Sequence, residues 1–447
     1  MTGVAAQMCG DRKTIILLGY KVELDGTILR EETDENGKKT WVHFSKLGAR
    51  KAVLNDLSPA ATFIAYNYNT PVDVIAFERE AKRILREVED ECGWMYETNH
   101  NGAKDLDGNE IKGKINYTVW SDVFICPECA GEVVFWEVAV DKDAGKVRDI
   151  FPCPQCQAQL TKRKMERAWT TKYDSALNET IKQVKQVPVL INYTVSGARG
   201  RFEKRPDESD LALIDKIENA SIPYWFPTDK IQKGVKTGEP IRIGITHVHH
   251  FYTKRNLCAL SSLISHCNLQ NCSMFLASSI INRSTIMNRI HLKYYFFGGG
   301  GWNAGYMKGT LYISSLPIET SISEQVESRI KSIGRAFSTK ENVEGIFEIG
   351  SSSLERLIMP NCSLDYIFLD PPFGSNIMYS ELNILWESLL KVRTNNKSEA
   401  IENRFQNKGL QEYRQLMTSC FKEAFRMLKP GRWMTVEFSN TKASVWN

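Results

Sequence analysis

The chain has 447 residues, a formal net charge of +4 at pH 7, and 42% hydrophobic and 25% charged residues. This length allows two or three domains with a large core, and the composition is ordinary for a soluble globular protein. A transmembrane helix is not expected, because no stretch approaches the roughly 20 consecutive apolar residues that one needs.

The N-terminal residues and the cysteines indicate a compartment. Residues 1–10 lack the basic-then-apolar pattern of a secretion signal. Without such a signal, 11 cysteines in a chain of this length favour a reducing environment over a disulfide framework. We therefore expect a cytoplasmic protein with no membrane partner. The mild positive charge permits a nucleic-acid partner without requiring one.

Residues 1–93 predict alternating helices and strands. Two turn signals, Asp25-Gly26 and Asn36-Gly37, predict a β-hairpin within residues 22–44. Ser58 followed by Pro59 is typical of a helix start, where a cap residue precedes a first-turn proline. The predicted helices cover residues 1–8, 59–69 and 74–92, and the predicted strands cover residues 14–18 and 52–56.

Residues 94–344 lose this alternation and predict an inserted region with a metal site. Cys126-Pro-Glu-Cys129 and Cys153-Pro-Gln-Cys156 are two C-x-x-C pairs, each expected to form a tight turn that aims two thiolates at one point. Two such turns predict a closed tetrahedral site for a structural Zn²⁺ ion. We expect a zinc ribbon at about residues 120–165, with a strand over 133–140. Four unrelated buried cysteines are the alternative.

Two further groups in this region have open interpretations. His247, His249 and His250 could bind a metal, but their spacing matches no ligand pattern well, so a polar strand end or a phosphate-facing loop is favoured. The glycine- and arginine-rich residues 197–205 predict a flexible basic loop, which either contacts nucleic acid or is a solvated face.

Residues 345–447 return to the α/β pattern and contain the most informative motif. The predicted strands cover residues 345–349, 365–370 and 433–438, and the predicted helices cover residues 379–390 and 410–428. The strand over 365–370 ends in Asp370-Pro371-Pro372-Phe373. Two prolines cannot continue a sheet ladder, so this motif lies at the carboxyl edge of a strand, where ligands bind in open α/β sheets. Taken alone, the motif is better interpreted as a strand that stops at a Pro-Pro turn, and the other features of the chain shift this interpretation.

The chemistry of this motif suits an exocyclic amine of adenine or cytosine. Such an amine needs acceptors for both N–H bonds before it can take a methyl group. Asp370 and the carbonyl of Pro371 can supply them, while Phe373 stacks on the base. The sulfonium of S-adenosylmethionine is already activated, so the protein contributes positioning and hydrogen bonding.

The chain resembles the amino-methyltransferases of DNA, and among them the adenine-specific DNA methylases that contain a zinc ribbon. The resemblance covers nearly the whole chain. It rests on Asp370–Gly374 followed by Tyr379–Asn383 and Trp386, on the two C-P-x-C pairs, and on Asn55–Pro59. It implies a Rossmann-like class I methyltransferase sheet, incomplete at both ends, formed by residues 1–93 and 345–447. Residues 94–344 would be the target-recognition region.

The resemblance also implies site residues and a substrate. Asp56 would hydrogen-bond to the ribose hydroxyls of S-adenosylmethionine, with Thr2 and Leu57 in the same cofactor site; Asp56 could instead, or also, cap the helix after Ser58. The reaction would methylate a base flipped out of double-stranded DNA, with adenine N6 as the expected acceptor and cytosine N4 as the other. Restriction or defence-system proteins are the implied protein partners.

Two alternatives stay open. The chain could be a zinc-ribbon nucleic-acid-binding protein with a truncated, inactive methyltransferase core, or an RNA amino-methyltransferase. The first alternative arises because the family's glycine-containing cofactor loop, Asp-Pro-Phe-x-Gly-Ser/Thr-Gly, would precede Thr2 and is absent from the sequence. Its glycines let the backbone approach the cofactor closely. We therefore expect a fragment or a misassigned start, and weak affinity for S-adenosylmethionine.

Overall fold

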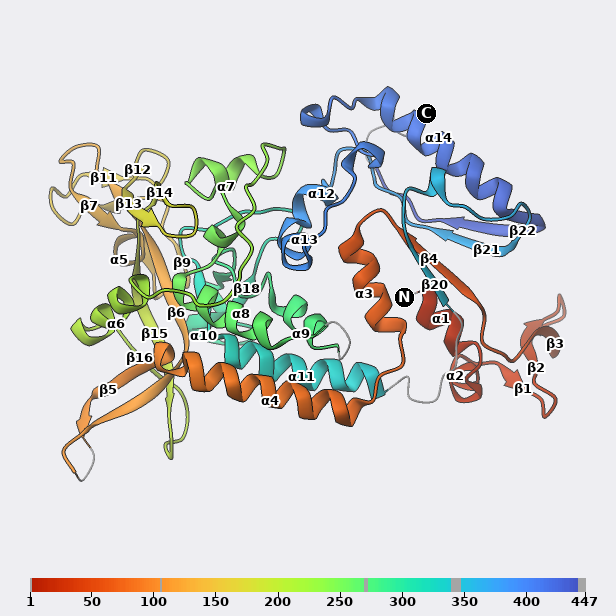
Figure 1. The fold of residues 1–447 in the computed structure, drawn as a ribbon, viewed down its shortest axis with the longest axis horizontal. Coiled ribbons are helices and arrows are strands. Elements are labelled where there is room, and N and C mark those ends of the chain that lie inside the picture. The colour runs from red at the N-terminus through yellow and green to blue at the C-terminus, as the bar shows by residue number, and fades with distance from the viewer. Residues whose placement is uncertain (1, 105–106, 269–271, 339–346, 441–447) are drawn as a thin grey trace. The chain divides into compact units, whose positions relative to one another are not determined.

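A computed structural model describes residues 2–104, 107–268, 272–338 and 347–440 (Figure 1). The chain is a mixed α/β protein with two compact units, and each is formed from separate stretches of sequence. The first unit comprises residues 1–77, 333–383 and 390–447. The second unit comprises residues 78–332 and 384–389. The three predicted domains, 1–93, 94–344 and 345–447, stay a prediction.

The described residues of the first unit form three small sheets. Strands β1 (Lys21–Val22), β2 (Thr27–Thr33) and β3 (Lys39–Lys46) form an antiparallel meander, which confirms the predicted hairpin. β4 (Ala52–Asp56) pairs in parallel with β20 (Phe347–Ser351). β21 (Leu364–Leu369) pairs in parallel with β22 (Leu428–Val436). Because these parallel strands form two separate pairs in the described residues, one continuous Rossmann-like sheet stays a prediction.

The helices of the first unit follow local sequence signals closely. Ser58 caps α3 (Pro59–Asn69), because its hydroxyl accepts the N–H of Ala61 at 3.4 Å and Pro59 fills the first turn. The other helices in or entering this unit are α1 (Thr2–Met8), α2 (Arg12–Leu17), α12 (Tyr379–Leu382) and α14 (Leu410–Met427), with parts of α4 (Val74–Cys92) and α11 (Ile322–Ser338). The helices predicted over 59–69 and 74–92 are confirmed.

One prediction for this unit is wrong. Residues 14–18 were expected to form a strand, but the chain is helical over α2. The carboxylate of Asp11 accepts the N–H groups of Lys13 and Thr14, so a local cap satisfies the first turn. Leu17 is 86% exposed, so no packing on a sheet opposes this cap.

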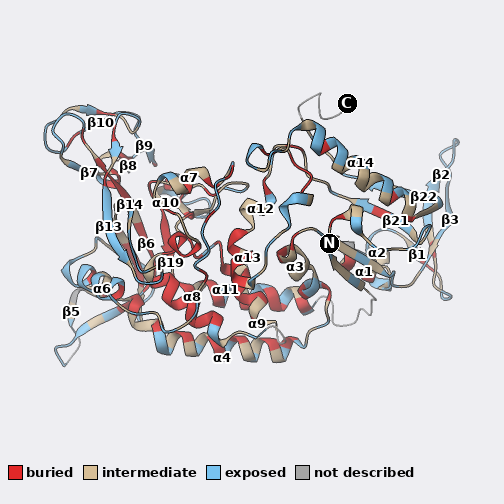
Figure 2. Cartoon of the chain, turned by 45° about the horizontal axis from the view of Figure 1, so that its top comes forward, coloured by how far each residue is buried: buried red, intermediate tan, exposed pale blue. Residues whose placement is uncertain are grey.

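The second unit is organised around one long strand, β6 (Glu110–Ile125). Residues 115–119 and 121–124 of β6 are buried, so both faces of the strand are covered (Figure 2). Six other strands belong to its antiparallel sheet: β5 (Glu97–Lys104), β7 (Glu132–Val134), β12 (Glu166–Arg167), β15 (Gln186–Val195), β16 (Phe202–Lys204) and β19 (Ile318–Thr320). The helices of this unit include α6 (Glu208–Glu218), α8 (Lys254–His266), α9 (Ser273–Ile280), α10 (Leu292–Phe297) and most of α13 (Ile384–Leu390).

A separate hairpin extends from this unit. Strand β13 (Trp169–Asp174) pairs only with β14 (Glu179–Val184) among the described strands. Most of its residues are exposed, in contrast to those of β6 (Figure 2). Across the described residues, no helix has both the length and the apolar composition that crossing a membrane requires.

Candidate functional site

The four predicted zinc ligands lie in two copies of the same turn. Cys126–Cys129 follows β6, and Cys153–Cys156 connects β10 (Phe151–Pro152) to β11 (Gln159–Leu160). In each turn the residue after the second cysteine donates its N–H to the carbonyl of the first, from Ala130 to Cys126 and from Gln157 to Cys153. Ala130 and Gln157 adopt left-handed backbone conformations, with φ of 58° and 61°. The repeated turn directs two pairs of sulfur atoms toward each other.

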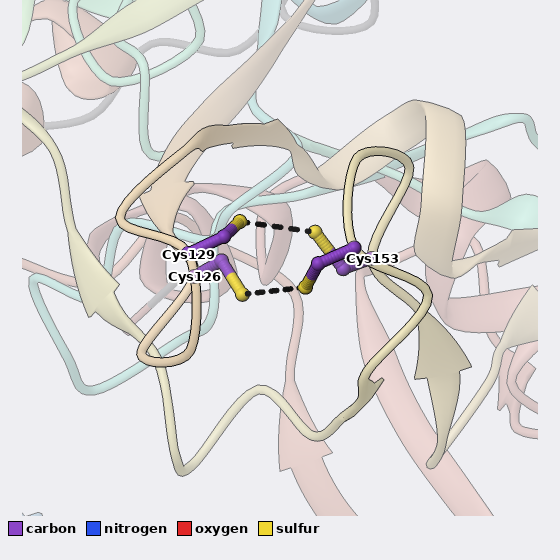
Figure 3. A group of neighbouring side chains, drawn as sticks. Cys126, Cys129 and Cys153 are labelled. Atoms are coloured by element: carbon purple, nitrogen blue, oxygen red, sulfur yellow. Dashed lines mark hydrogen bonds between the residues drawn. The ribbon is translucent and has the colours of Figure 1, made fainter.

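The spacing of the sulfur atoms matches a tetrahedral metal site. Sγ of Cys126 lies 3.8 Å from Sγ of Cys156, and Sγ of Cys129 lies 3.8 Å from Sγ of Cys153 (Figure 3). A Zn²⁺ ion with Zn–S bonds of about 2.3 Å sets its ligands about 3.8 Å apart. A disulfide would need about 2.05 Å. The cluster can therefore hold a structural Zn²⁺ ion, with all four positions filled by protein.

The surroundings of the cluster support this interpretation. Cys126 and Cys153 are fully buried in an apolar core with Phe124, Phe151 and Leu160, while Cys129 and Cys156 are exposed. The backbone N–H of Cys156 lowers the pKa of the Cys153 thiol to about 7, whereas the pKa of Cys156 is raised to about 12 and that of Cys129 is also raised. The assignment of a metal site therefore depends on the geometry of the sulfur atoms.

The predicted strand over residues 133–140 is wrong. β7 ends at Val134, residues Phe135–Ala139 form helix α5, and only Val140–Asp141 return to a strand, β8. The helix buries Phe135, Trp136 and Ala139 together against the core of the zinc module. A strand would have pointed Phe135 and Trp136 to opposite faces. Ser121 also accepts the N–H of Trp136, at 2.9 Å, which fixes the start of this helix.

The second predicted site lies in the first unit, at the ends of two parallel strands. Asp56 is the last residue of β4, and Asp370 directly follows β21. Both residues are exposed. The pKa of Tyr379 is raised, mainly by partial burial. The nearby carboxylates of Asp370, Asp56 and Glu399 raise it further. The structure thus brings the two predicted acids to the neighbourhood of one tyrosine.

Residues far along the chain hold the Pro-Pro-Phe segment. The hydroxyl of Tyr413 in α14 donates to the carbonyl of Pro372 at 2.9 Å. Asn440 donates from Nδ2 to the carbonyl of Phe373 at 2.9 Å, and the Phe373 ring makes an edge contact with Phe438 at a centroid distance of 5.4 Å. Sequence reasoning missed Tyr413 and Asn440, because nothing in their local sequence indicates contact with residues 372–373.

The structure describes the side chains of two of the three predicted cofactor residues, Asp56 and Leu57, but not that of Thr2. Oδ1 of Asp56 accepts the N–H of Ser58 at 2.8 Å, so Asp56 braces the turn before α3, while the helix cap itself is the hydroxyl of Ser58. Leu57 is half-buried between β4 and α3. Thr2 begins α1, but its side chain lies outside the described residues.

A buried glutamate, Glu399, hydrogen-bonds to Ser380, the residue after Tyr379. Sequence reasoning also missed this glutamate. Glu399 is 3% exposed. Its two carboxylate oxygens accept the backbone N–H of Ser380 at 3.0 Å and the hydroxyl of Ser380 at 2.6 Å, and Gln406 donates to it at 3.1 Å. These bonds fix the start of α12, where Tyr379 lies.

A third cluster joins the histidines of the second unit to the hairpin. Oδ2 of Asp174 lies 2.7 Å from Nε2 of His249 and 2.8 Å from Nε2 of His250. Ligands around a tetrahedral Zn²⁺ ion with bonds of 2.0–2.1 Å would lie about 3.3 Å apart. Burial lowers the pKa of His250 to about 4 and also lowers that of His249, so both rings are neutral near pH 7. The short distances are those of Nε2–H groups donating to the carboxylate.

No family model, no curated protein and no solved structure matches the chain.

Proposed function

We propose that the chain is an S-adenosylmethionine-dependent DNA methyltransferase that acts on the exocyclic amine of a flipped-out base, with adenine N6 as the acceptor. The main support is the placement of Asp370 and Asp56. Both follow or end strands of parallel pairs, and both lie near Tyr379. The carboxyl ends of parallel strands are where α/β proteins bind nucleotides and related ligands. The resemblance of Asp370–Gly374 to the zinc-ribbon adenine methylases agrees with this assignment.

In this proposal the two parallel pairs belong to one Rossmann-like methyltransferase sheet, and the cofactor and the base bind on the same edge. S-adenosylmethionine would supply an activated methyl group. Asp56 is exposed at its strand end, has hydrogen-bond acceptors that suit ribose hydroxyls, and is held by Ser58. Leu57 would contact the cofactor, and Thr2 belongs to the same proposed site.

The residues of the motif would position the base and accept hydrogen bonds from its amine. Asp370 and the carbonyl of Pro371 would accept the two N–H bonds of the amine, which orients its lone pair toward the methyl group. The neighbouring carbonyl of Pro372 is held by Tyr413, so the segment is braced from α14. Phe373 would stack on the flipped base and replace part of the stacking lost from the duplex.

Transfer of a radiolabelled methyl group from S-adenosylmethionine to unmethylated duplex DNA tests this proposal. We expect Asp370→Ala to lower the transfer rate by about 100-fold or more, because it removes an acceptor for the reacting amine. Asp365→Ala is the matched control: Asp365 lies in β21, the strand that Asp370 follows, and makes surface ion pairs with Lys429 and Arg432. It should keep full activity. Equal rates in Asp370→Ala and the wild type would move the chemistry away from this motif.

A zinc-ribbon nucleic-acid-binding protein without methyl transfer is the second candidate. It is favoured by the Cys126/Cys129/Cys153/Cys156 cluster, because the sulfur spacing suits a zinc ion whether or not the chain binds S-adenosylmethionine. The same assay separates the two: DNA binding without any transfer would select the second candidate. Replacing the DNA with RNA in parallel reactions tests an RNA amino-methyltransferase.

A further inference from the structure

The outward face of the β13–β14 hairpin has an unusual composition for an exposed ribbon. Paired residues of an antiparallel ribbon share a face, and alternate residues along a strand share it too. The register pairs Trp169 with Val184, Thr171 with Lys182 and Tyr173 with Thr180. Trp169 is 42% exposed and Tyr173 is 63% exposed. Two aromatic rings, two threonines and a lysine therefore lie on one solvent-facing surface, which we term the hairpin face.

The opposite face of the hairpin is anchored to the second unit. Gln183 is buried and donates to the carbonyl of Gly244 at 3.4 Å. Asp174 ends β13 and uses both oxygens: Oδ1 accepts the N–H groups of Ala176 and Leu177 in the turn, and Oδ2 binds His249 and His250. These bonds join the tip of the hairpin to the 3₁₀ helix Val248–Phe251. The hairpin face is thus held in place from behind.

The charges on and beside the hairpin favour a polyanion. Residues 161–173 contain five basic residues and one acidic residue. Lys182 lies on the hairpin face, and the exposed cations Arg163 and Lys164 come shortly before the hairpin in the sequence. Exposed Lys172 lies on the other face of the hairpin, and the exposed acids of this region are Glu166 and Glu179. The ammonium of Lys182 lies 5.2 Å from the centroid of the Trp169 ring, which places a positive charge beside an aromatic surface. Aromatic rings interleaved with cations are the pattern that binds bases and phosphates together.

We propose that the hairpin face binds single-stranded nucleic acid, with Trp169 and Tyr173 stacking on unpaired bases and the nearby cations meeting phosphates. A single strand is favoured because a ring on a ribbon surface can stack only on a base whose own face is uncovered. In a duplex those faces are covered by neighbouring base pairs, and the ribbon would meet only base edges. The inference rests on the proposed function and deepens it, since a base must be unpaired before it can reach the methyl group, and unpaired bases are what the hairpin face would bind.

Fluorescence anisotropy tests this inference on the full chain without S-adenosylmethionine. The probe is a labelled single-stranded oligonucleotide of about 15 nucleotides, a length that such binding surfaces can cover. We expect Trp169→Ala/Tyr173→Ala to weaken binding of the single strand about tenfold or more. Trp169→Phe/Tyr173→Phe keeps both rings and should restore affinity to within about threefold. Trp225→Ala is the matched control, because Trp225 is 44% exposed elsewhere in the same unit. Unchanged zinc content and circular dichroism verify that each variant is folded.

Several results would overturn the inference. These are unchanged binding of the single strand by the double alanine variant, an equal loss in Trp225→Ala, or a loss of duplex binding in the double alanine variant as large as its loss of single-strand binding. Parallel DNA and RNA oligonucleotides identify which single strand binds better. Methyl transfer separates this inference from the proposed function: a chain that binds as expected but transfers no methyl group keeps the hairpin face and loses the proposed activity. If the chain transfers methyl groups but its double alanine variant binds the single strand normally, the proposed activity is kept and the role of the hairpin face is lost.

Discussion

Two clusters of the second unit contain residue types that bind metals, yet they have different geometry. The four cysteines are set 3.8 Å apart across the cluster, which is the spacing of ligands around an ion. Oδ2 of Asp174 lies 2.7 Å from Nε2 of His249 and 2.8 Å from Nε2 of His250. These are the distances of hydrogen-bonded atoms. Residue type alone therefore does not identify a metal site. The distance between ligand atoms, and whether they already satisfy one another, separates the two cases.

Removing zinc should produce the largest loss of stability, and it tests whether the four-cysteine cluster is a metal site. Chelation, or Cys126→Ser/Cys153→Ser, should unfold the zinc module, because structural zinc contributes on the order of 10 kcal/mol to folding of small zinc domains. Circular dichroism and limited proteolysis would follow the loss. Metal analysis should find one zinc ion per wild-type chain and none in the double variant. Two ions per wild-type chain would show that the histidine cluster binds metal as well.

Breaking the histidine cluster should cost less but still destabilise the fold. Asp174→Ala leaves the buried Nε2–H groups of His249 and His250 without their acceptor, so we expect a loss of about 2–4 kcal/mol in the free energy of unfolding. Urea denaturation measures it. Asp143→Ala, at an exposed aspartate of the same unit, is the control and should change stability by less than about 0.5 kcal/mol. Zinc content should be unaffected, and an Asp174→Ala variant as stable as the wild type would refute the hydrogen-bonded interpretation.

The smallest expected effect is the pH dependence of this same cluster. Burial holds the folded-state pKa of His250 at about 4, below the value of about 6.5 expected when unfolded. The unfolded chain therefore binds more protons between these values, so stability present above pH 6.5 is lost as the pH falls toward 4. The shifts of His249 and Asp174 are also downward and act in the same direction. The contribution of His250 is at most about 3 kcal/mol.

Urea denaturation between pH 7 and pH 4 checks this sign. His250→Gln removes the titrating ring and should flatten the profile in this range, while the zinc content stays at one ion per chain. A profile in His250→Gln as steep as that of the wild type would assign the acid sensitivity to other groups.

Local signals were sufficient to predict several features. Ser58-Pro59 defined the start of α3, and the two C-x-x-C pairs defined both turns of the zinc cluster, because neighbouring residues determine these structures. Local signals also misled. The apolar residues after Thr14 resemble a strand, but the cap by Asp11 decides the conformation. The segment that begins at Phe135 also resembles a strand, but only a helix buries both aromatic side chains.

The candidate sites depend partly on contacts that no local pattern contains. Asp174 meets His249 and His250 across 75 and 76 residues of sequence. Tyr413 reaches Pro372 across 41 residues. Such contacts depend on how the elements pack, so a single sequence predicts a strand that ends next to Asp370 but not the groups that brace the segment after it.

The parallel pairing of β4 with β20 has a consequence for synthesis of the chain. Asn55 at the end of β4 donates to the carbonyl of Ser352, a residue 297 positions later. At roughly 5–20 residues per second, β4 leaves the ribosome roughly 15–60 seconds before its partner exists. During that interval its edge is open to pairing with any other extended segment, including one from a neighbouring nascent chain. The first unit cannot complete this sheet until Ser351 has been made, whereas the sequence from β5 to α11 is available to fold earlier.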